Sequence, residues 1–398
     1  MSWEKVKLGD IAANIQTGPF GSQLHQSDYS EEGTPVVMPK DLVAGHISEA
    51  SIARVSDDHV SRLSRHKIQV GDILYSRRGD VGRCAFATEY EKGWLCGTGC
   101  LRVTIDTEKA VPKFVFYQLQ KAETIGWVEK HAVGSTMLNL NTSILSNVPV
   151  ELPPIAEQKR IVEILSAFDS LIENNQKQIK LLEEAAQRLY KEWFVDLRFP
   201  GYENPPIVDG VPEGWQTQSM NDIAEYINGY AFKPSDWSMT GKPIIKIKEM
   251  GSGVTADTPR NTGENIPDKY NVSAGDILFS WSATLSAMIW DEEDGLLNQH
   301  LFKVIPHSGI SREFVLQSIL KTLDEFSNLT TGSTMKHIQR GKLKEVFVCV
   351  PNGETMLEYQ AVSEPIREQI LRLRRQMILL GEARDRLLPK LMNGEIEV

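Results

Sequence analysis

The sequence repeats itself once, and this duplication restricts the possible folds more than any other feature. Residues 10–12 (Asp-Ile-Ala) recur 212 residues later, at 222–224. Gly-Asp-Ile-Leu at 71–74 recurs after 204 residues, and Gly-Ser-Thr-Met at 134–137 recurs after 198. Because the three matches keep their order while the spacing falls steadily, chance is a poor explanation. We predict two copies of one structural unit.

Each copy predicts a mixed α/β globule of roughly 150 residues, which is a usual domain size. In the first copy, a β-like run at 34–38 is followed by the Gly-Asp-Ile-Leu segment, a further strand at 101–103 and a short helix at 114–120. The Gly-Ser-Thr-Met segment, an apolar strand and a proline close the unit. The corresponding runs of the second copy are 243–247, 301–304 and 314–320.

After the proline, each copy changes to a seven-residue apolar period that predicts a long coiled-coil helix. Pro153 precedes the first helix and Pro200 follows it, as helix boundaries should. Asn175 occupies a core position, where a polar side chain typically fixes helix register. In the second copy, Pro365 interrupts the start of the helix and Arg384 breaks the apolar series. The seam residues are Ile161, Leu165, Phe168, Ile172, Asn175, Ile179, Leu182 and Leu189 in the first helix, and Ile366, Leu373, Leu380 and Leu387 in the second.

The order of these parts predicts their packing. A helix of ~40 residues is ~60 Å long and must bury its seam, and its own duplicate is the nearest partner. Because the ends of a domain usually lie close together, the second helix must run back along the first. We expect an α+β fold with two similar mixed α/β globular domains at opposite ends of two long antiparallel coiled-coil helices, related by a pseudo-two-fold internal repeat. The expected boundaries are 1–152 for the first globule, 153–199 for the central helix, 200–350 for a linker and the second globule, and 351–398 for the distal helix.

Composition limits the classes of function. Lys and Arg total 43 against 53 Asp and Glu, and the net charge of −10 disfavours a protein that coats nucleic acid non-specifically. A local basic face stays possible, since residues 54–83 hold seven basic and four acidic side chains. The four cysteines lack zinc-site spacing, so we expect free thiols in a reducing cytoplasm. The sequence shows neither a signal-peptide pattern nor a run of ~18 apolar residues, so we expect a cytoplasmic protein without a membrane span.

Two similar but divergent domains at a fixed spacing suit duplex DNA, which presents two half-sites. Five segments belong to one recognisable pattern: 152–162 (Leu-Pro-Pro-Ile-Ala-Glu-Gln-Lys-Arg-Ile-Val), 212–215 (Pro-Glu-Gly-Trp), the two Gly-Ser-Thr-Met segments, and 386–396 (Arg-Leu-Leu-Pro-Lys-Leu-Met-Asn-Gly-Glu-Ile). On these residues, and along its whole length, the chain resembles the specificity (S) subunit of a type I restriction-modification system. The second copy departs from the pattern at 350–353, where Val-Pro-Asn-Gly replaces Leu-Pro-Pro-Ile.

This resemblance implies that the globules are target recognition domains, each reading one half of an asymmetric bipartite DNA site. It implies that the helices are the spacer and dock methyltransferase (M) subunits, expected to be two, through which restriction (R) subunits join. The chain itself would be no enzyme and would bind no cofactor or metal. S-adenosylmethionine, ATP and Mg²⁺ are expected on the partner subunits of a complex that acts as a site-specific deoxyribonuclease and an adenine-N6 DNA methyltransferase.

Candidate DNA contacts follow from the side chains that read DNA: Arg or Lys on guanine, Asn or Gln on adenine, and hydroxyls on phosphate. Arg77 and Arg78 follow the Gly-Asp-Ile-Leu strand, and the matched positions of the second copy hold Trp281 and Ser282. This divergence is expected of two domains that read different sequences. For the Gly-Ser-Thr-Met segments, a tight turn is an equally good interpretation. The other candidates are Lys40 and its match Lys248, Lys246, and the hydroxyls of Ser135, Thr136, Ser333 and Thr334.

Two other classes of function stay open. A non-catalytic coiled-coil scaffold with two protein- or ligand-binding domains would suit the acidic total, and it predicts no salt-dependent DNA affinity. A stand-alone methyltransferase is suggested by 204–207 (Asn-Pro-Pro-Ile), which resembles the Asn/Asp-Pro-Pro-aromatic loop of adenine-N6 methyltransferases. However, Ile207 cannot stack on a flipped base, and no glycine-rich cofactor loop precedes it. The sequence also lacks a Walker A lysine and the paired carboxylates of a nuclease.

Overall fold

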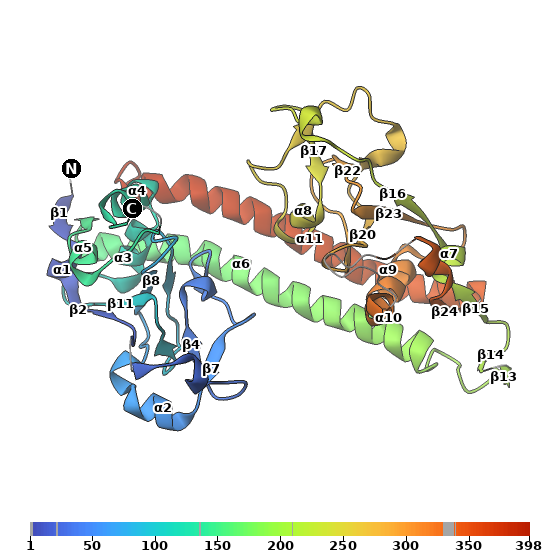
Figure 1. Ribbon diagram of the computed structural model, residues 1–398, viewed down its shortest axis with the longest axis horizontal. Helices are drawn as coiled ribbons and strands as arrows, with labels where there is room; N and C mark the ends of the chain where they lie inside the picture. Colours follow the sequence, from blue (N-terminus) through green and yellow to red (C-terminus); the bar gives the residue numbers. More distant parts are fainter. Residues whose placement is uncertain (1–2, 21–22, 135–136, 209, 329–337, 339) are drawn as a thin grey trace. The chain divides into compact units, whose positions relative to one another are not determined.

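The computed structural model describes residues 3–20, 23–134, 137–208, 210–328, 338 and 340–398 (Figure 1). The chain divides into two compact units. Unit 1 is Met1–Leu171 with Leu380–Val398, and unit 2 is Ile172–Leu379. Each unit therefore holds one globule together with a part of each long helix.

The globule of unit 1 contains two four-stranded sheets and a two-stranded ribbon. The first sheet is antiparallel, with the order β2 (Ala12–Thr17), β11 (Cys100–Ile105), β8 (Ile73–Ser76) and β9 (Cys84–Phe86). The second has the order β10 (Leu95–Cys96), β4 (Thr34–Val37), β7 (Ala53–Val55) and β3 (Tyr29–Ser30), and its β10–β4 pair is parallel. The ribbon pairs β1 (Glu4–Lys7) with β12 (Pro149–Leu152). The helices that follow β11 are α3 (Pro112–Leu119) and α4 (Ala122–His131).

The globule of unit 2 repeats this plan. Its antiparallel sheet has the same order, with β16 (Ala224–Asn228), β23 (Leu301–Pro306), β20 (Ile277–Ser280) and β21 (Ser286–Ile289). Its second sheet has the order β18 (Arg260–Asn261), β17 (Lys242–Ile245), β22 (Gly295–Leu297) and β19 (Asn271–Val272), again with one parallel pair, β17–β22. The ribbon pairs β15 (Gln216–Ser219) with β24 (Phe347–Val350), and the helices are α9 (Arg312–Lys321) and α10 (Leu323–Asn328). The predicted internal repeat and mixed α/β content are confirmed.

The repeated Gly-Asp-Ile-Leu segment starts the central strand in both units. Gly71 and Gly275 have φ angles of 85° and 97°, in the left-handed region that glycine adopts without strain. Asp72 and Asp276 each accept a hydrogen bond from the backbone amide three residues earlier, at 2.7 and 2.9 Å. The turn places the two apolar residues that follow it in the core, so the repeated motif serves the fold of each unit.

The two long helices are α6 (Ile155–Tyr190), which continues as a π-helical turn over Lys191–Val195, and α11 (Gly353–Met392). Every predicted seam position is buried or half-buried. In unit 1, Asp169 pairs with Arg384, and the start of α6 shares a core with the end of α11. In unit 2, Glu183 pairs with Arg374, and Phe194 packs on Tyr359 with ring centroids 4.8 Å apart. Partner numbers fall along α11 as they rise along α6, so the helices are antiparallel within each unit, as predicted.

The expectation that Pro365 interrupts the second helix is wrong. The helix begins at Gly353, one residue after Asn352, whose side chain caps it by accepting from the Thr355 amide at 2.9 Å. Pro365 is exposed, so its ring faces solvent and its missing N–H costs one hydrogen bond. Burial of Tyr359 and of other core-facing residues before and after Pro365 keeps the helix continuous.

Within the described part of the chain, no helix combines the length and apolarity needed to cross a membrane.

Candidate nucleic-acid interface

In unit 1, loops from four parts of the chain meet at the end of β8. The Arg77 amide donates to the Gly99 carbonyl, and the Arg77 carbonyl accepts from the Leu140 amide, both at 2.8 Å. The Arg77 guanidinium carbon lies 6.0 Å from the centroid of the Phe20 ring, which is 57% exposed. The Arg77 Nε–H has no acceptor among the described residues. A guanidinium with one buried, unpaired N–H therefore lies beside an exposed ring at one sheet end.

Unit 2 builds the same backbone framework around a different side chain. The Trp281 amide donates to the His300 carbonyl at 3.4 Å, and the Trp281 carbonyl accepts from the Ile338 amide at 2.9 Å. The indole Nε1 donates to Asn228 Oδ1 at 3.2 Å, and the ring lies 5.8 Å from that of Phe302. A guanidinium in one unit and an indole in the other thus occupy equivalent backbone positions.

The next residue differs in exposure between the units. Arg78 is exposed, and its carbonyl accepts from the buried Ser76 hydroxyl at 3.1 Å. Ser282 is only 2% exposed, and its Oγ lies 3.2 Å from His300 Nδ1. Arg78 can reach a ligand in solution, whereas Ser282 orients the His300 ring. Of the candidates that follow the central strands, Ser282 is the one the structure turns inward.

Lys40 and Lys248 lie on equivalent turns. In unit 1 the Met38 amide donates to Asp41 at 2.8 Å, and in unit 2 the Lys246 amide donates to Glu249 at 3.0 Å. Both acceptors are buried, while both lysines on these turns are exposed. In unit 1, burial raises the pKa of the Asp41 carboxyl.

The two lysine side chains have different surroundings. Lys40 Nζ donates to Ser51 Oγ at 3.0 Å and lies 3.9 Å from Asp41. The ammonium of Lys248 has no partner among the described residues. Lys246, two residues before it, places its Nζ 5.7 Å from the centroid of the Trp237 ring. Ser135, Thr136, Ser333 and Thr334 lie outside the described residues.

Sequence reasoning missed Phe20, Asn228 and His300 as members of these clusters. Phe20 lies in the Gly-Pro-Phe-Gly-Ser segment at 18–22, which is glycine-rich but lacks the lysine of a Walker A loop. An aromatic residue flanked by glycine and proline in a polar loop is itself a signal of exposure. Nothing local marks Asn228 or His300, because their roles depend on the fold that brings them to Trp281.

The polar seam position has a polar partner on the other long helix. Asn175 is 6% exposed, and its Nδ2 donates to Gln376 Oε1 across the helix pair at 3.4 Å. A lone polar group in an apolar seam favours the alignment that gives it a polar partner. We retain the interpretation that Asn175 aligns the helices and does not contact DNA.

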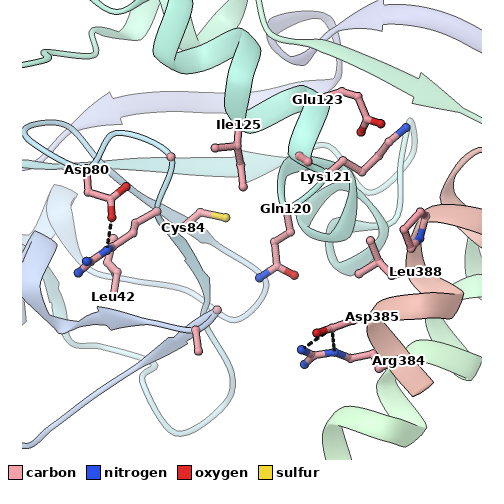
Figure 2. Close-up of a pocket in the computed structure, with 16 residues that line it drawn as sticks. Leu42, Asp80, Cys84, Gln120, Lys121, Glu123, Ile125, Arg384, Asp385 and Leu388 are labelled. Atoms are coloured by element: carbon pink, nitrogen blue, oxygen red, sulfur yellow. Dashed lines mark hydrogen bonds and ion pairs between the residues drawn. The ribbon is translucent and has the colours of Figure 1, made fainter. Parts of the chain in front are cut away.

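A cavity of about 600 Å³ separates the globule of unit 1 from the end of α11 (Figure 2). Its charges are largely neutralised in pairs: Arg384 Nη2 lies 2.9 Å from Asp385 Oδ1, and Arg83 Nε lies 2.6 Å from Asp80 Oδ2. Lys121 Nζ lies 3.5 Å from Glu151 Oε2 and also donates to Asn393 Oδ1. The cavity therefore lacks the uncompensated positive charge that phosphate binding needs. Among the described residues, no three His, Cys, Asp or Glu side chains gather to hold a metal ion.

Comparison with known proteins identifies one family. The model described as "Type I restriction modification DNA specificity domain" matches residues 1–184 and 212–361. The MjaIX specificity subunit of Methanocaldococcus jannaschii is 24% identical, covering 100% of this chain and 94% of its own. The HindI specificity subunit of Haemophilus influenzae is also 24% identical, covering 99% of both. The crystal structure of a type I S subunit from M. genitalium matches the fold with a TM-score of 0.59 at 15% identity, covering 98% of this chain and 96% of that one.

Proposed function

The chain belongs to the type I restriction-modification DNA specificity family, and from this premise we propose that its two globules are target recognition domains. Each reads one half of an asymmetric, bipartite site on duplex DNA, and the paired helices fix the spacing between the halves. The chain performs no chemistry itself.

The observation that carries this proposal is the matched pair Arg77 and Trp281. Both follow the central strand of the same sheet and make equivalent backbone hydrogen bonds. Arginine reads guanine through two parallel hydrogen bonds, whereas the indole of Trp281, whose N–H is already donated to Asn228, offers an apolar face. One scaffold that carries different side chains at one position is suited to reading two different half-sites. Lys40, Lys246 and Lys248 are proposed as phosphate contacts that position the domains.

The helices are proposed to dock two methyltransferase subunits, through which restriction subunits join. Large apolar side chains stay exposed on both helices although the seam is filled. Such side chains, when they gather on one face, mark a surface for a partner. They include Leu171 and Leu181 in α6, with 50 and 64% exposure, and Leu357, Val362, Ile378 and Leu379 in α11, with 68, 47, 48 and 57%. S-adenosylmethionine, ATP and Mg²⁺ would then be bound by the partner subunits.

A binding experiment tests this function. The chain is co-expressed with its methyltransferase subunit, adenine methylation of the host DNA is sequenced, and the motif is placed in a 40-base-pair duplex. We expect binding to this duplex to exceed binding to a scrambled duplex at least tenfold and to weaken steeply with salt. Equal affinity for both duplexes would defeat the proposal. If the complex shows no affinity for either duplex at any salt concentration, the coiled-coil scaffold is favoured instead. If the chain alone methylates DNA, a stand-alone methyltransferase is favoured.

A further inference from the structure

One β-turn has the same construction in both units. In unit 1 it spans residues 30–33, between β3 and β4. The Ser30 hydroxyl donates to the Glu32 carbonyl at 2.6 Å, and Arg54 Nη1 donates to the Gly33 carbonyl at 3.0 Å. Gly33 has a φ angle of 116°, and a Cβ there would lie 2.3 Å from the Val55 carbonyl oxygen. The turn is therefore fixed in shape and requires its glycine.

In unit 2 the equivalent turn spans residues 238–241. The Ser238 hydroxyl donates to the Thr240 carbonyl at 2.8 Å, and Arg260 Nη1 donates to the Gly241 carbonyl at 2.9 Å. Gly241 has a φ angle of 102°, and a Cβ there would lie 2.3 Å from the Asn261 carbonyl oxygen. Each hydrogen bond of the first turn is thus reproduced in the second.

The tips of these matched turns carry opposite chemistry. Unit 1 exposes Glu31 and Glu32. Unit 2 has Met239 and Thr240 at the same positions, and the Met239 side chain is 95% exposed. Trp237, just before the turn, is 53% exposed. An apolar side chain this exposed, beside an exposed indole and on a rigid turn, has no role in the core of its own unit.

The turn of unit 2 adjoins the candidate DNA interface. Lys246 Nζ lies 5.7 Å from the centroid of the Trp237 ring, so a cation stands beside the apolar tip. The residue before Lys246 is joined to the segment between β22 and β23, because the Ile245 carbonyl accepts from the Asn298 amide at 3.1 Å. His300, two residues further on, bonds to the Trp281 backbone. Trp237, Lys246 and the Trp281 backbone are therefore connected in series within unit 2, and Met239 lies two residues after Trp237.

We propose that Trp237 and Met239 form an apolar DNA contact that belongs to the second half-site alone, which rests on the function proposed above. Proteins that bend or grip duplexes press methionine and aromatic side chains against base steps while nearby cations hold the phosphates. The tip of unit 2 has both components. The tip of unit 1 is repelled by phosphates, because Glu31 and Glu32 carry the same sign of charge. The duplicated turn thus gives units 1 and 2 different contacts with DNA.

The test compares Trp237→Ala and Met239→Ser with the matched control Glu31→Ala. Each full-length chain is purified with its methyltransferase subunit and titrated into the 40-base-pair duplex that carries the methylated motif, at four salt concentrations. We expect each unit 2 variant to bind about tenfold more weakly, the scale of one lost base–aromatic contact. The slope of log affinity against log salt should not change, because no phosphate contact is removed. Glu31→Ala should bind as tightly as the wild type or slightly more tightly.

The possible outcomes distinguish failure of the apolar contact from failure of the proposed DNA-reading function. If the wild-type complex does not prefer its motif, the proposed function fails. If the wild type prefers its motif and both unit 2 variants bind within twofold of it, the apolar contact is refuted while the function stands. If the variants lose the methyltransferase subunit instead, the tip is a protein-docking surface and the DNA contact is refuted. Because both side chains are exposed, thermal unfolding should be unchanged in every variant.

Discussion

The Oδ1 atom of Asp169 lies 3.2 Å from Nη1 of Arg384 and so joins α6 to α11 within unit 1. The other oxygen of this carboxylate accepts from the Tyr117 hydroxyl at 2.6 Å and lies 3.6 Å from Lys113 Nζ. Arg384, which breaks the apolar series in the sequence, is therefore held by a specific acidic partner. Through Tyr117 and Lys113 the same carboxylate also anchors α3 of the globule to the helix pair.

Replacing Asp169 should destabilise unit 1. Asp169→Ala removes a 13% exposed carboxylate, leaves Tyr117 without its acceptor, and leaves Arg384 with Asp385 as its remaining acidic partner. We expect the free energy of unfolding to fall by about 2 to 3 kcal/mol, below the range for fully buried pairs because Arg384 is partly solvated. Urea unfolding followed by circular dichroism measures this. The control is Arg386→Ala, at an 81% exposed side chain on the same helix, which should cost little. Equal effects of the two variants would contradict the anchoring role.

The two long helices should tolerate a charged side chain at exposed positions but not in their buried seam. Leu165 is fully buried, so Leu165→Glu places a carboxylate in the core and should lower the stability of unit 1 by about 3 kcal/mol or more. Leu181 on the same helix is 64% exposed, and Leu181→Glu should leave the melting temperature unchanged. Calorimetry of the two full-length variants checks the contrast. A similar loss in both would show that the seam is assigned to the wrong face.

The exposed apolar residues of the helices should matter for assembly and not for folding. Leu181→Glu and Leu379→Glu should each reduce co-purification of the methyltransferase subunit at least tenfold, because a charge would be buried at the contact. Phe347→Glu, at an apolar side chain of 56% exposure in β24 of the same unit, is the matched control and should co-purify normally. Retention of the methyltransferase by both helix variants would count against docking on these helices.

Acid should destabilise the fold through His66. This side chain is 3% exposed, and burial together with the nearby Arg65 and Arg102 guanidinium groups lowers its pKa to about 4. Between pH 6.5 and about 4 the unfolded chain binds a proton that the folded chain rejects, so stability is lost as pH falls through this window. At pH values below about 4, His66 lowers the free energy of unfolding by about 3 kcal/mol relative to neutral pH. His66→Gln should flatten the profile of unfolding free energy in this window, and an unchanged profile would refute the assignment.

The two base-reading positions should act on separate half-sites. Arg77→Ala should cost about 1 to 3 kcal/mol of discrimination at one half of the motif and leave the other half unaffected. Trp281→Ala should do the reverse. Competition binding with duplexes mutated in one half at a time measures both. Loss of discrimination at both halves from a single substitution would show that the globules do not read independently.

Sequence reasoning succeeded where a pattern repeats over many residues. The heptads of α6 predict a long helix, and the Gly-Asp-Ile-Leu motif predicts a turn followed by a strand. Both predictions depend only on residues close together in the chain. Pro365 was misjudged because a local rule was overridden by burial of the helix on both sides. The Phe20–Arg77 contact and the burial of Ser282 depend on loops that only the finished sheet brings together, and no local signal in this single sequence encodes them.

Adenine methylation sequencing after exchange of one globule tests the central claim most directly. Residues 1–152 are replaced by the corresponding globule of another specificity subunit, and the hybrid is expressed with its methyltransferase partner in cells that lack other adenine methylation. We expect a new motif in which one half is changed while the other half and the spacing between them are kept. A motif changed in both halves, or not changed at all, would contradict it.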